Sequence, residues 1–113
     1  MKKINPEVTE FQKRVYATTR KIPRGKVTTY KHLAQAIRCD SSQAVGQALR
    51  VNPFAPEVPC HRVIRSDLTI GGFSGQLEGP RIEEKKALLS KEGVEFDGDR
   101  LLNPDDVYAF DNL

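Results

Sequence analysis

The feature that most constrains the fold of this chain is a series of short helical patterns interrupted by turn sequences. Apolar residues recur at near-helical spacing through residues 5–22, with Asn5 as a candidate N-cap and Pro6 at the first helical position. The turn sequence PRG at 23–25 ends this segment. The recurring apolar residues are Val8, Phe11, Val15 and Ile22. The chain therefore begins with a helix that needs a partner for one apolar face.

Two shorter helical segments follow. After the extended sequence KVTT, a hydroxyl cap at Thr28 or Thr29 starts a segment at 30–37. A third segment covers 42–51, and Pro53 prevents its continuation. The expected buried residues are Leu33, Ala34 and Ile37 in the second segment and Val45 and Leu49, flanked by Ala48, in the third.

The connection between these two segments, RCDSS, is short and contains the candidate caps Asp40 and Ser41. Two short helices joined this closely, after a longer supporting helix, are typical of a helix-turn-helix, although many helical bundles share the spacing. Gly46 costs up to about 1 kcal/mol relative to alanine in a helix, which indicates close approach of another surface. That surface is either a bound molecule or a helix of the same protein.

The remainder of the chain is more mixed. RSDLTIGGF at 65–73 predicts a tight turn or hairpin, a candidate wing. Residues 79–93 predict a helix with Pro80 near its start and Gly93 as its C-cap. Its apolar face contains Ile82 and Leu89. The acidic tail, about residues 97–113, contains one strand-like alternation and a short helix capped at Asn103, and we expect it to have only a packing role.

Length and charge set the class of protein. The 113 residues fit one domain, so we expect a single mainly α domain with a small β component, similar to a winged helix-turn-helix. Residues 1–65 carry 13 lysines and arginines against 4 acidic residues, whereas residues 66–113 carry 5 against 11. A basic half is typical of nucleic-acid binding, and ordinary solvation of helix faces is the alternative.

No apolar run approaches the roughly 20 residues that span a bilayer, and the N-terminus lacks the apolar stretch of a secretory signal. We therefore expect an intracellular protein, cytoplasmic or, in a eukaryote, nuclear, without a membrane partner. Cys39 and Cys60 are expected to be free thiols in a reducing compartment. The two cysteines and two histidines match no zinc-site spacing, so no metal is expected.

The sequence VPCHRVI places Cys60 beside His61. A cysteine attacks as a thiolate, and an ordinary thiol is only a few per cent ionised at neutral pH, so it needs a base and usually a group that orients the base. His61 is the candidate base and Glu92 the candidate orienting acid. Neighbouring side chains on an extended segment point to opposite faces, so a buried, unreactive Cys60 is the alternative.

PCHRV at 59–63, preceded by AVGQALRVNP and followed by GGFSG and EG, closely resembles the active-site domain of the O6-alkylguanine-DNA alkyltransferases. The resemblance runs from about Phe11 to Val94. It implies a DNA-repair protein that flips the damaged nucleotide and transfers the alkyl group irreversibly to its own cysteine, as a methylated-DNA–protein-cysteine methyltransferase that acts once and needs no cofactor. It also implies that this domain stands alone, without the N-terminal domain frequent in the family, and acts as a monomer on double-stranded DNA.

The resemblance assigns roles to individual residues. Cys60 is the acceptor, His61 polarises it through a water molecule, and Glu92 orients His61. Asn52 ties the recognition helix to the active-site segment. Tyr30 helps to rotate the nucleotide and donates a proton toward the leaving guanine.

Further residues are assigned to the base and to the duplex. The carbonyls of Cys60 and Val63 accept from the exocyclic amine, Ser74 donates near O6, and Pro59 and Phe73 shape the pocket wall. The resemblance places the recognition helix in the minor groove. Its expected DNA contacts are Gln43, Ala44, Gly46, Gln47 and Arg50, with Tyr30, and with Arg24, Lys26 and Lys31 on the phosphates.

One residue departs from the family pattern. Family members usually carry an arginine that fills the space of the flipped base, where this chain has Gln43, so we predict weaker lesion capture. An alternative function is that of the alkyltransferase-like proteins, which bind the lesion without transfer but usually carry tryptophan in place of Cys60. A Cys-His hydrolase is a third possibility, for which no oxyanion-hole sequence is evident.

Overall fold

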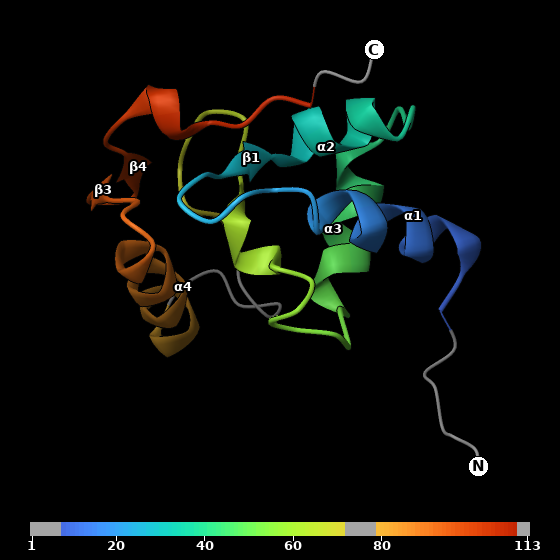
Figure 1. Ribbon diagram of the computed structural model, residues 1–113, viewed down its shortest axis with the longest axis horizontal. Helices are drawn as coiled ribbons and strands as arrows, with labels where there is room; N and C mark the ends of the chain where they lie inside the picture. Colours follow the sequence, from blue (N-terminus) through green and yellow to red (C-terminus); the bar gives the residue numbers. More distant parts are fainter. Residues whose placement is uncertain (1–7, 72–78, 111–113) are drawn as a thin grey trace.

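The computed structural model describes residues 8–71 and 79–110. Three helices form most of its first half (Figure 1). They are α1 (Glu10–Thr19), α2 (Tyr30–Ala36) and α3 (Ser42–Arg50). Each follows a hydroxyl cap, because the side chains of Thr9, Thr29 and Ser41 each accept a hydrogen bond from a backbone N–H in the first turn.

The start of the first helix differs from the sequence prediction. α1 begins at Glu10, where Thr9 and Gln12 form a reciprocal capping box. This box satisfies two backbone donors, which explains why the helix begins here rather than at Pro6. The predicted cap Asn5 and Pro6 lie outside the described residues. α1 also ends earlier, at Thr19, and Ile22 is buried in the turn that follows.

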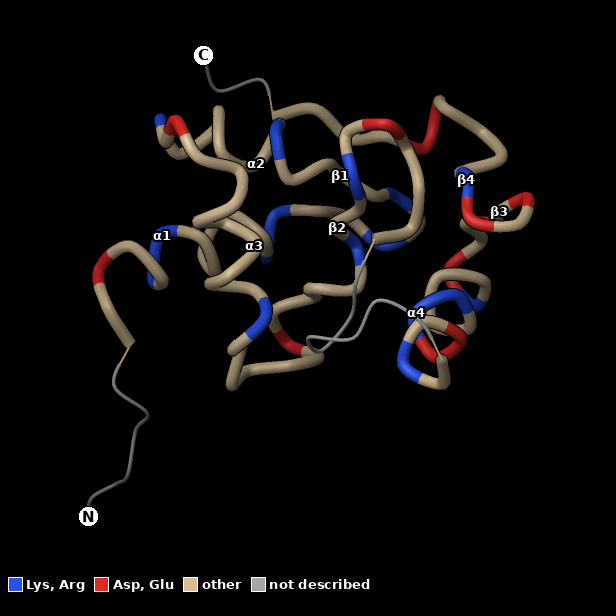
Figure 2. The backbone as a smooth tube through the Cα atoms, turned by 180° about the vertical axis from the view of Figure 1, so that it is seen from behind, with Lys and Arg blue, Asp and Glu red and all other residues tan. Residues whose placement is uncertain are grey.

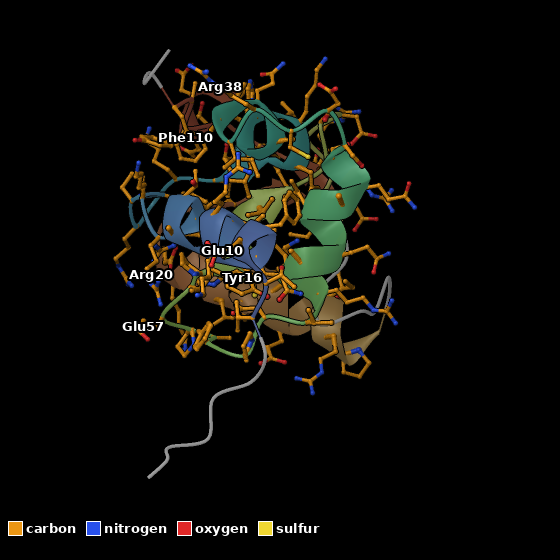
Figure 3. All side chains as sticks on the ribbon, turned by 90° about the vertical axis from the view of Figure 1, so that its right-hand side faces the viewer. Glu10, Tyr16, Arg20, Arg38, Glu57 and Phe110 are labelled. Atoms are coloured by element: carbon orange, nitrogen blue, oxygen red, sulfur yellow. The ribbon has the colours of Figure 1, made fainter. Side chains whose placement is uncertain are left out.

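The three helices form the first of two buried clusters. The cluster includes all six residues predicted to be buried in this region: Leu33, Ala34, Ile37, Val45, Ala48 and Leu49. α1 contributes Tyr16, whose hydroxyl donates to the carbonyl of Ala48 at 2.7 Å and so fixes α1 against α3. Figure 3 shows Tyr16 between these helices. In the connection between α2 and α3, Arg38 adopts a left-handed backbone with φ of 59°.

The β structure consists of two short pairs, of which the first lies near the centre of the molecule (Figure 1). β1 (Thr28–Thr29) pairs in parallel with β2 (Val63–Ile64), which directly follows the 3-10 turn η1 (Cys60–Arg62). The predicted wing is a tight turn, closed by a hydrogen bond from the Arg65 N–H to the Thr69 carbonyl at 3.0 Å. Its last two predicted residues lie outside the described residues.

The second half is built on α4 (Pro80–Lys91), followed by β3 (Phe96–Asp97), β4 (Arg100–Leu101) and the turn η2 (Pro104–Asp106). α4 ends in a Schellman motif: Gly93 has φ of 90°, and the Val94 N–H donates to the Leu89 carbonyl at 2.9 Å. The second buried cluster comprises Val27, Ile64, Ile70, Ile82, Leu89, Val94 and Leu101. The predicted cap Asn103 accepts from the Asp105 N–H at 3.0 Å.

The acidic tail crosses back over the molecule toward α2 (Figure 1). Val107 forms a parallel bridge with Val27, on the segment that leads into β1. Figure 2 shows that most acidic positions gather around α4, β3 and β4. Among the described helices, none is both long and apolar enough to cross a membrane. The structure confirms the predicted mainly α fold with a small β component.

Candidate active site

Cys60 lies in η1 and packs against the first buried cluster. The backbone is fixed on both sides, because the Cys60 N–H donates to the Val58 carbonyl at 2.8 Å and the Val63 N–H donates to the Cys60 carbonyl. Pro59 and Val63 are buried, whereas Cys60 is half-buried. The sequence therefore places a thiol on a rigid turn that remains partly accessible.

Asn52 connects this turn to the end of α3. Its Nδ2 donates to the Val58 carbonyl at 3.0 Å, and its Oδ1 accepts from the Phe54 N–H at 2.9 Å. Both ends of the amide are used, so Asn52 holds the loop between α3 and η1 in one conformation. The sequence expected Asn52 to tie the recognition helix to the active-site segment, and the structure places it between the end of α3 and η1.

Glu92 at the C-terminus of α4 reaches the residue next to the cysteine. Its Oε2 lies 3.0 Å from His61 Nε2, and both side chains are less than 10% exposed, at 6% for His61 and 7% for Glu92. Thirty-one positions separate these residues in the sequence, yet they form the pair that the sequence predicted.

Arg62, which the sequence interpretation did not single out, also binds Glu92. Its Nε donates to Oε1 and its Nη2 to Oε2, both at 2.9 Å. Burial opposes ionisation of Glu92, but the hydrogen bonds and charges of Arg62 and His61 outweigh it and lower the pKa of Glu92 to about 2. The carboxyl is therefore ionised at neutral pH.

The charge of Glu92 determines the state of His61. An ionised carboxylate accepts only, so His61 Nε2 carries the hydrogen and Nδ1 is the acceptor in the neutral ring. Burial lowers the pKa of His61 below its ordinary value, against the opposing effect of Glu92. His61 is therefore a neutral imidazole at neutral pH, which is the form that can accept a proton.

Tyr30 lies between two glycines, on α3 and after β2. A Cβ atom at Gly46 would lie 3.9 Å from Tyr30 Cε1, and one at Gly71 would lie 3.6 Å from Cε2. Burial, together with the negative charge of a Cys60 thiolate, raises the pKa of Tyr30 to about 12. Its hydroxyl thus keeps its hydrogen at neutral pH, and its role toward the base stays a prediction.

Lys85 is the second residue that the sequence interpretation missed. Its side chain is fully buried, and Nζ donates to the carbonyls of Val63 at 2.8 Å and Ile70 at 2.6 Å. Val63 was expected to accept from the exocyclic amine of the base. Because a carbonyl has two lone pairs, the contact with Lys85 leaves that role available.

The outer face of α3 carries the expected DNA contacts. Gln43, Gln47 and Arg50 are exposed and Ala44 and Gly46 are half-buried, whereas Val45, Ala48 and Leu49 face the core.

The three expected phosphate ligands outside α3 differ in their present contacts. Lys31 is exposed. Arg24 donates to the Lys91 carbonyl at 3.1 Å, and Lys26 donates to the Asp105 carbonyl at 3.0 Å. Phe73 and Ser74 lie outside the described residues. The roles of all these residues toward DNA stay predictions.

Comparison with known proteins gives matches to a single family. A family model described as 6-O-methylguanine DNA methyltransferase, DNA binding domain, matches residues 10–94. The methylated-DNA–protein-cysteine methyltransferase of Thermococcus sibiricus is 46% identical over 87 residues, which cover 76% of this chain and 46% of that protein. Its counterpart from Methanothermobacter thermautotrophicus is 43% identical over 90 residues, which cover 80% of this chain and 48% of that protein. The chain thus spans about half the length of the curated relatives it matches.

Two solved structures are informative neighbours. The O6-methylguanine-DNA methyltransferase from Pyrococcus kodakaraensis superposes with a TM-score of 0.66 at 48% identity, over 77% of this chain and 48% of that chain. Atl1 of S. pombe, in complex with damaged DNA containing O6-carboxymethylguanine, gives a TM-score of 0.75 at 29% identity, over 93% of this chain and all of that chain.

Proposed function

Because this chain belongs to the 6-O-methylguanine DNA methyltransferase family through the DNA-binding domain, we propose that it repairs alkylated DNA by direct reversal. In this proposal, Cys60 accepts the alkyl group from O6 of guanine in double-stranded DNA, and each molecule acts once. The observation that carries the proposal is the buried His61–Glu92 hydrogen bond of 3.0 Å immediately after an accessible cysteine.

The proposed transfer conserves atoms and charge. The sulfur of Cys60 forms a bond to the alkyl carbon as the bond from that carbon to O6 breaks. The thiol proton passes through one water molecule to Nδ1 of His61, while Glu92 stabilises the imidazolium that forms. The hydroxyl of Tyr30 supplies a proton toward the departing guanine, and its raised pKa keeps that proton available at neutral pH.

The lesion must leave the base stack before it can reach Cys60, which costs a few kcal/mol. We propose that the outer face of α3 lies against the duplex and that Arg24, Lys26, Lys31 and Arg50 bind phosphates, without reading the sequence. Residues 1–113 would act as one domain, with 97–113 as its tail. We expect the protein to reside with the DNA, in the cytoplasm or, in a eukaryote, the nucleus.

A second candidate function is lesion sensing without transfer. It is favoured by the match to Atl1, whose entire length this chain covers. Cys60 distinguishes the two candidates, because a sensor does not need a nucleophile beside the His61–Glu92 pair. We therefore place transfer first.

The test is intact-protein mass spectrometry after mixing the protein with an excess of a duplex that contains one O6-methylguanine. We expect one added methyl group on the wild type and on Cys39→Ser, and none on Cys60→Ser. Peptide mapping should locate the methyl group on Cys60. Tight lesion binding without a mass change would reject transfer and favour sensing.

A further inference from the structure

Arg65, directly after β2, is an exposed arginine beside Tyr30. A Cβ atom at Gly71 would lie 3.3 Å from Arg65 Cγ and 3.6 Å from Tyr30 Cε2, so the stem of the arginine and the ring of the tyrosine meet at one glycine. Burial raises the pKa of Tyr30 and the charge of a Cys60 thiolate adds to this effect, whereas the positive charge of Arg65 lowers it. The guanidinium is therefore close enough to act on the tyrosine hydroxyl.

The turn that carries Arg65 is held from two sides. Within the turn, the Arg65 N–H donates to the Thr69 carbonyl at 3.0 Å, and the Leu68 N–H donates to the Arg65 carbonyl at 2.9 Å. From β4, the Leu101 N–H donates to the Leu68 carbonyl at 2.8 Å. The side chain of Arg65 thus starts from a fixed backbone and packs on Gly71, which limits the positions of its guanidinium.

The guanidinium of Arg65 is available to a ligand. Among the described residues, no carboxylate lies within ion-pair distance of it. The acid of the same turn, Asp67, accepts from the Thr69 N–H at 3.0 Å and from the Thr69 hydroxyl at 2.7 Å. Arg62, by contrast, is already bound by both oxygens of Glu92. An exposed guanidinium on a fixed turn suits a phosphate, whose oxygens match its planar fork.

Arg65 and α3 lie at opposite edges of the Tyr30 ring. Gly46 of α3 faces Cε1, and Gly71, on which Arg65 packs, faces Cε2. With α3 against the duplex, a nucleotide that leaves the stack passes Tyr30 on its way to Cys60. Its phosphate then comes to the far edge of the ring, where Arg65 lies. A nucleotide that stays stacked keeps its phosphate on the duplex, away from this edge.

We propose that Arg65 binds the phosphate beside the flipped nucleotide, and so stabilises the extruded state rather than duplex binding in general. The proposal rests on the proposed function for the identity of the lesion. It adds a contact to the damaged strand that the outer face of α3 does not supply. Because extrusion costs least where the base pair is already weakened, such a contact favours alkylated over ordinary guanine.

The first test compares a duplex that contains O6-methylguanine with the same duplex undamaged. Binding is measured by fluorescence anisotropy at several salt concentrations in Cys60→Ser, which keeps the lesion intact. Adding Arg65→Gln should weaken binding of the damaged duplex about tenfold and reduce its salt slope by about 0.9, the value for one phosphate contact. The affinity for the undamaged duplex should change less than about twofold. Arg65→Lys, which keeps the charge, should recover most of the slope.

Two matched controls remove a positive charge elsewhere. Lys31→Gln, at an exposed position on α2, should weaken binding of both duplexes alike. Lys13→Gln, on α1, should weaken neither, because Lys13 is paired with Glu10 at 3.4 Å and lies on a different helix.

The second test uses a substrate without a phosphate. With Cys60 present, Arg65→Gln should slow methyl transfer from the damaged duplex several-fold at protein concentrations below saturation. Transfer from the free base O6-methylguanine, followed by intact-protein mass spectrometry, should proceed at the wild-type rate. A damaged pocket or a disturbed fold would slow both reactions.

Three results would overturn the role of Arg65. Equal losses on the two duplexes would make it an ordinary ligand of the duplex, unchanged lesion affinity would make it a solvated side chain, and a slower reaction with the free base would assign it to the pocket. If the wild type accepts no methyl group but Arg65→Gln loses lesion affinity as expected, the proposed function is wrong and the role of Arg65 stands. If transfer occurs and Arg65→Gln has no effect, the reverse holds.

Discussion

The side chain of Lys85 is fully buried, and its Nζ donates to the carbonyls of Val63 and Ile70. Burial lowers its pKa to about 7 from 10.5, against an opposing effect of Cys60. Between these two values the unfolded chain binds more protons than the folded protein. The free energy of unfolding should therefore rise with pH from 7 toward 10.5.

Chemical denaturation at pH 7, 8 and 9 tests this linkage. The wild type should gain up to about 1.4 kcal/mol per pH unit from Lys85, and Lys85→Met should lose that slope. Above pH 10 Tyr30 contributes the opposite sign, because its folded pKa is raised to about 12. The matched control is Lys86→Met, whose side chain is 26% exposed and pairs with Asp99 at 3.1 Å. An equal slope in Lys85→Met and the wild type would contradict a lowered pKa for Lys85.

Among individual residues, the sequence predicted the His61–Glu92 pair. The adjacent cysteine and histidine, together with the family pattern, limited the number of candidate residues. It did not reveal Arg62 or Lys85. Each acts through partners 15 to 40 positions away, and a single arginine or lysine in a basic chain resembles an ordinary surface residue. The one sequence indication for Arg62 was its place inside PCHRV.

Helix α3 contains Gly46, at a position where the folded protein leaves room for a larger side chain. A Cβ at Gly46 would make only an ordinary contact, 3.9 Å from Tyr30 Cε1. We expect Gly46→Ala to raise the free energy of unfolding by about 0.5–1 kcal/mol, as for glycine in a helix interior, and to weaken binding of both damaged and undamaged duplex. Denaturation and fluorescence anisotropy measure the two effects. Lower stability with unchanged affinity would favour the alternative, in which Gly46 serves helix packing.

Gln43 is exposed at the start of the same helix. Glutamine is shorter than the usual arginine and uncharged, so Gln43→Arg should increase the affinity for a lesion-containing duplex and the rate of methyl transfer several-fold. Gln47→Arg adds the same charge to the same exposed face and should increase affinity for damaged and undamaged DNA alike. Unchanged lesion affinity and unchanged transfer rate in Gln43→Arg would show that having glutamine in place of the usual arginine has no consequence.

Helices were the elements best predicted from the sequence, since caps and apolar spacing are local signals. The predicted segment at 30–37 became α2, and the one at 42–51 became α3, each one residue shorter. The strands were not predicted as pairs. β1 and β2 have two residues each, too few for an alternating pattern, and their partners are 35 positions apart.

In the whole molecule, the C-terminal tail packs against the rest of the chain. The family match covers residues 10–94 and so does not include this tail. The Val27 N–H donates to the Asp106 carbonyl at 2.9 Å, the Tyr108 N–H donates to the Val27 carbonyl at 2.6 Å, and Val27 is fully buried. The tail also places Phe110 against the first cluster, near α2, as Figure 3 shows. The sequence suggested only a packing role for the tail, and the packing depends on this long-range pairing, which no local pattern indicates.

Truncation after Asn103 should therefore lower the free energy of unfolding by roughly 2–4 kcal/mol, because it leaves buried backbone groups of Val27 unpaired and removes the contact of Phe110. Urea denaturation measures the effect. Leu102→Ser is the matched control, since Leu102 is 62% exposed and little change is expected. A truncated protein as stable as the full chain would exclude a structural role for the tail.

We propose that the protein reverses the lesion rather than only binding it. The most direct measurement is nucleoside analysis of the DNA after reaction with increasing amounts of protein. We expect each mole of protein to convert one mole of O6-methylguanine to guanine and then stop, with an equal amount of S-methylcysteine at Cys60. Full recovery of O6-methylguanine from a saturated protein–DNA complex would contradict it.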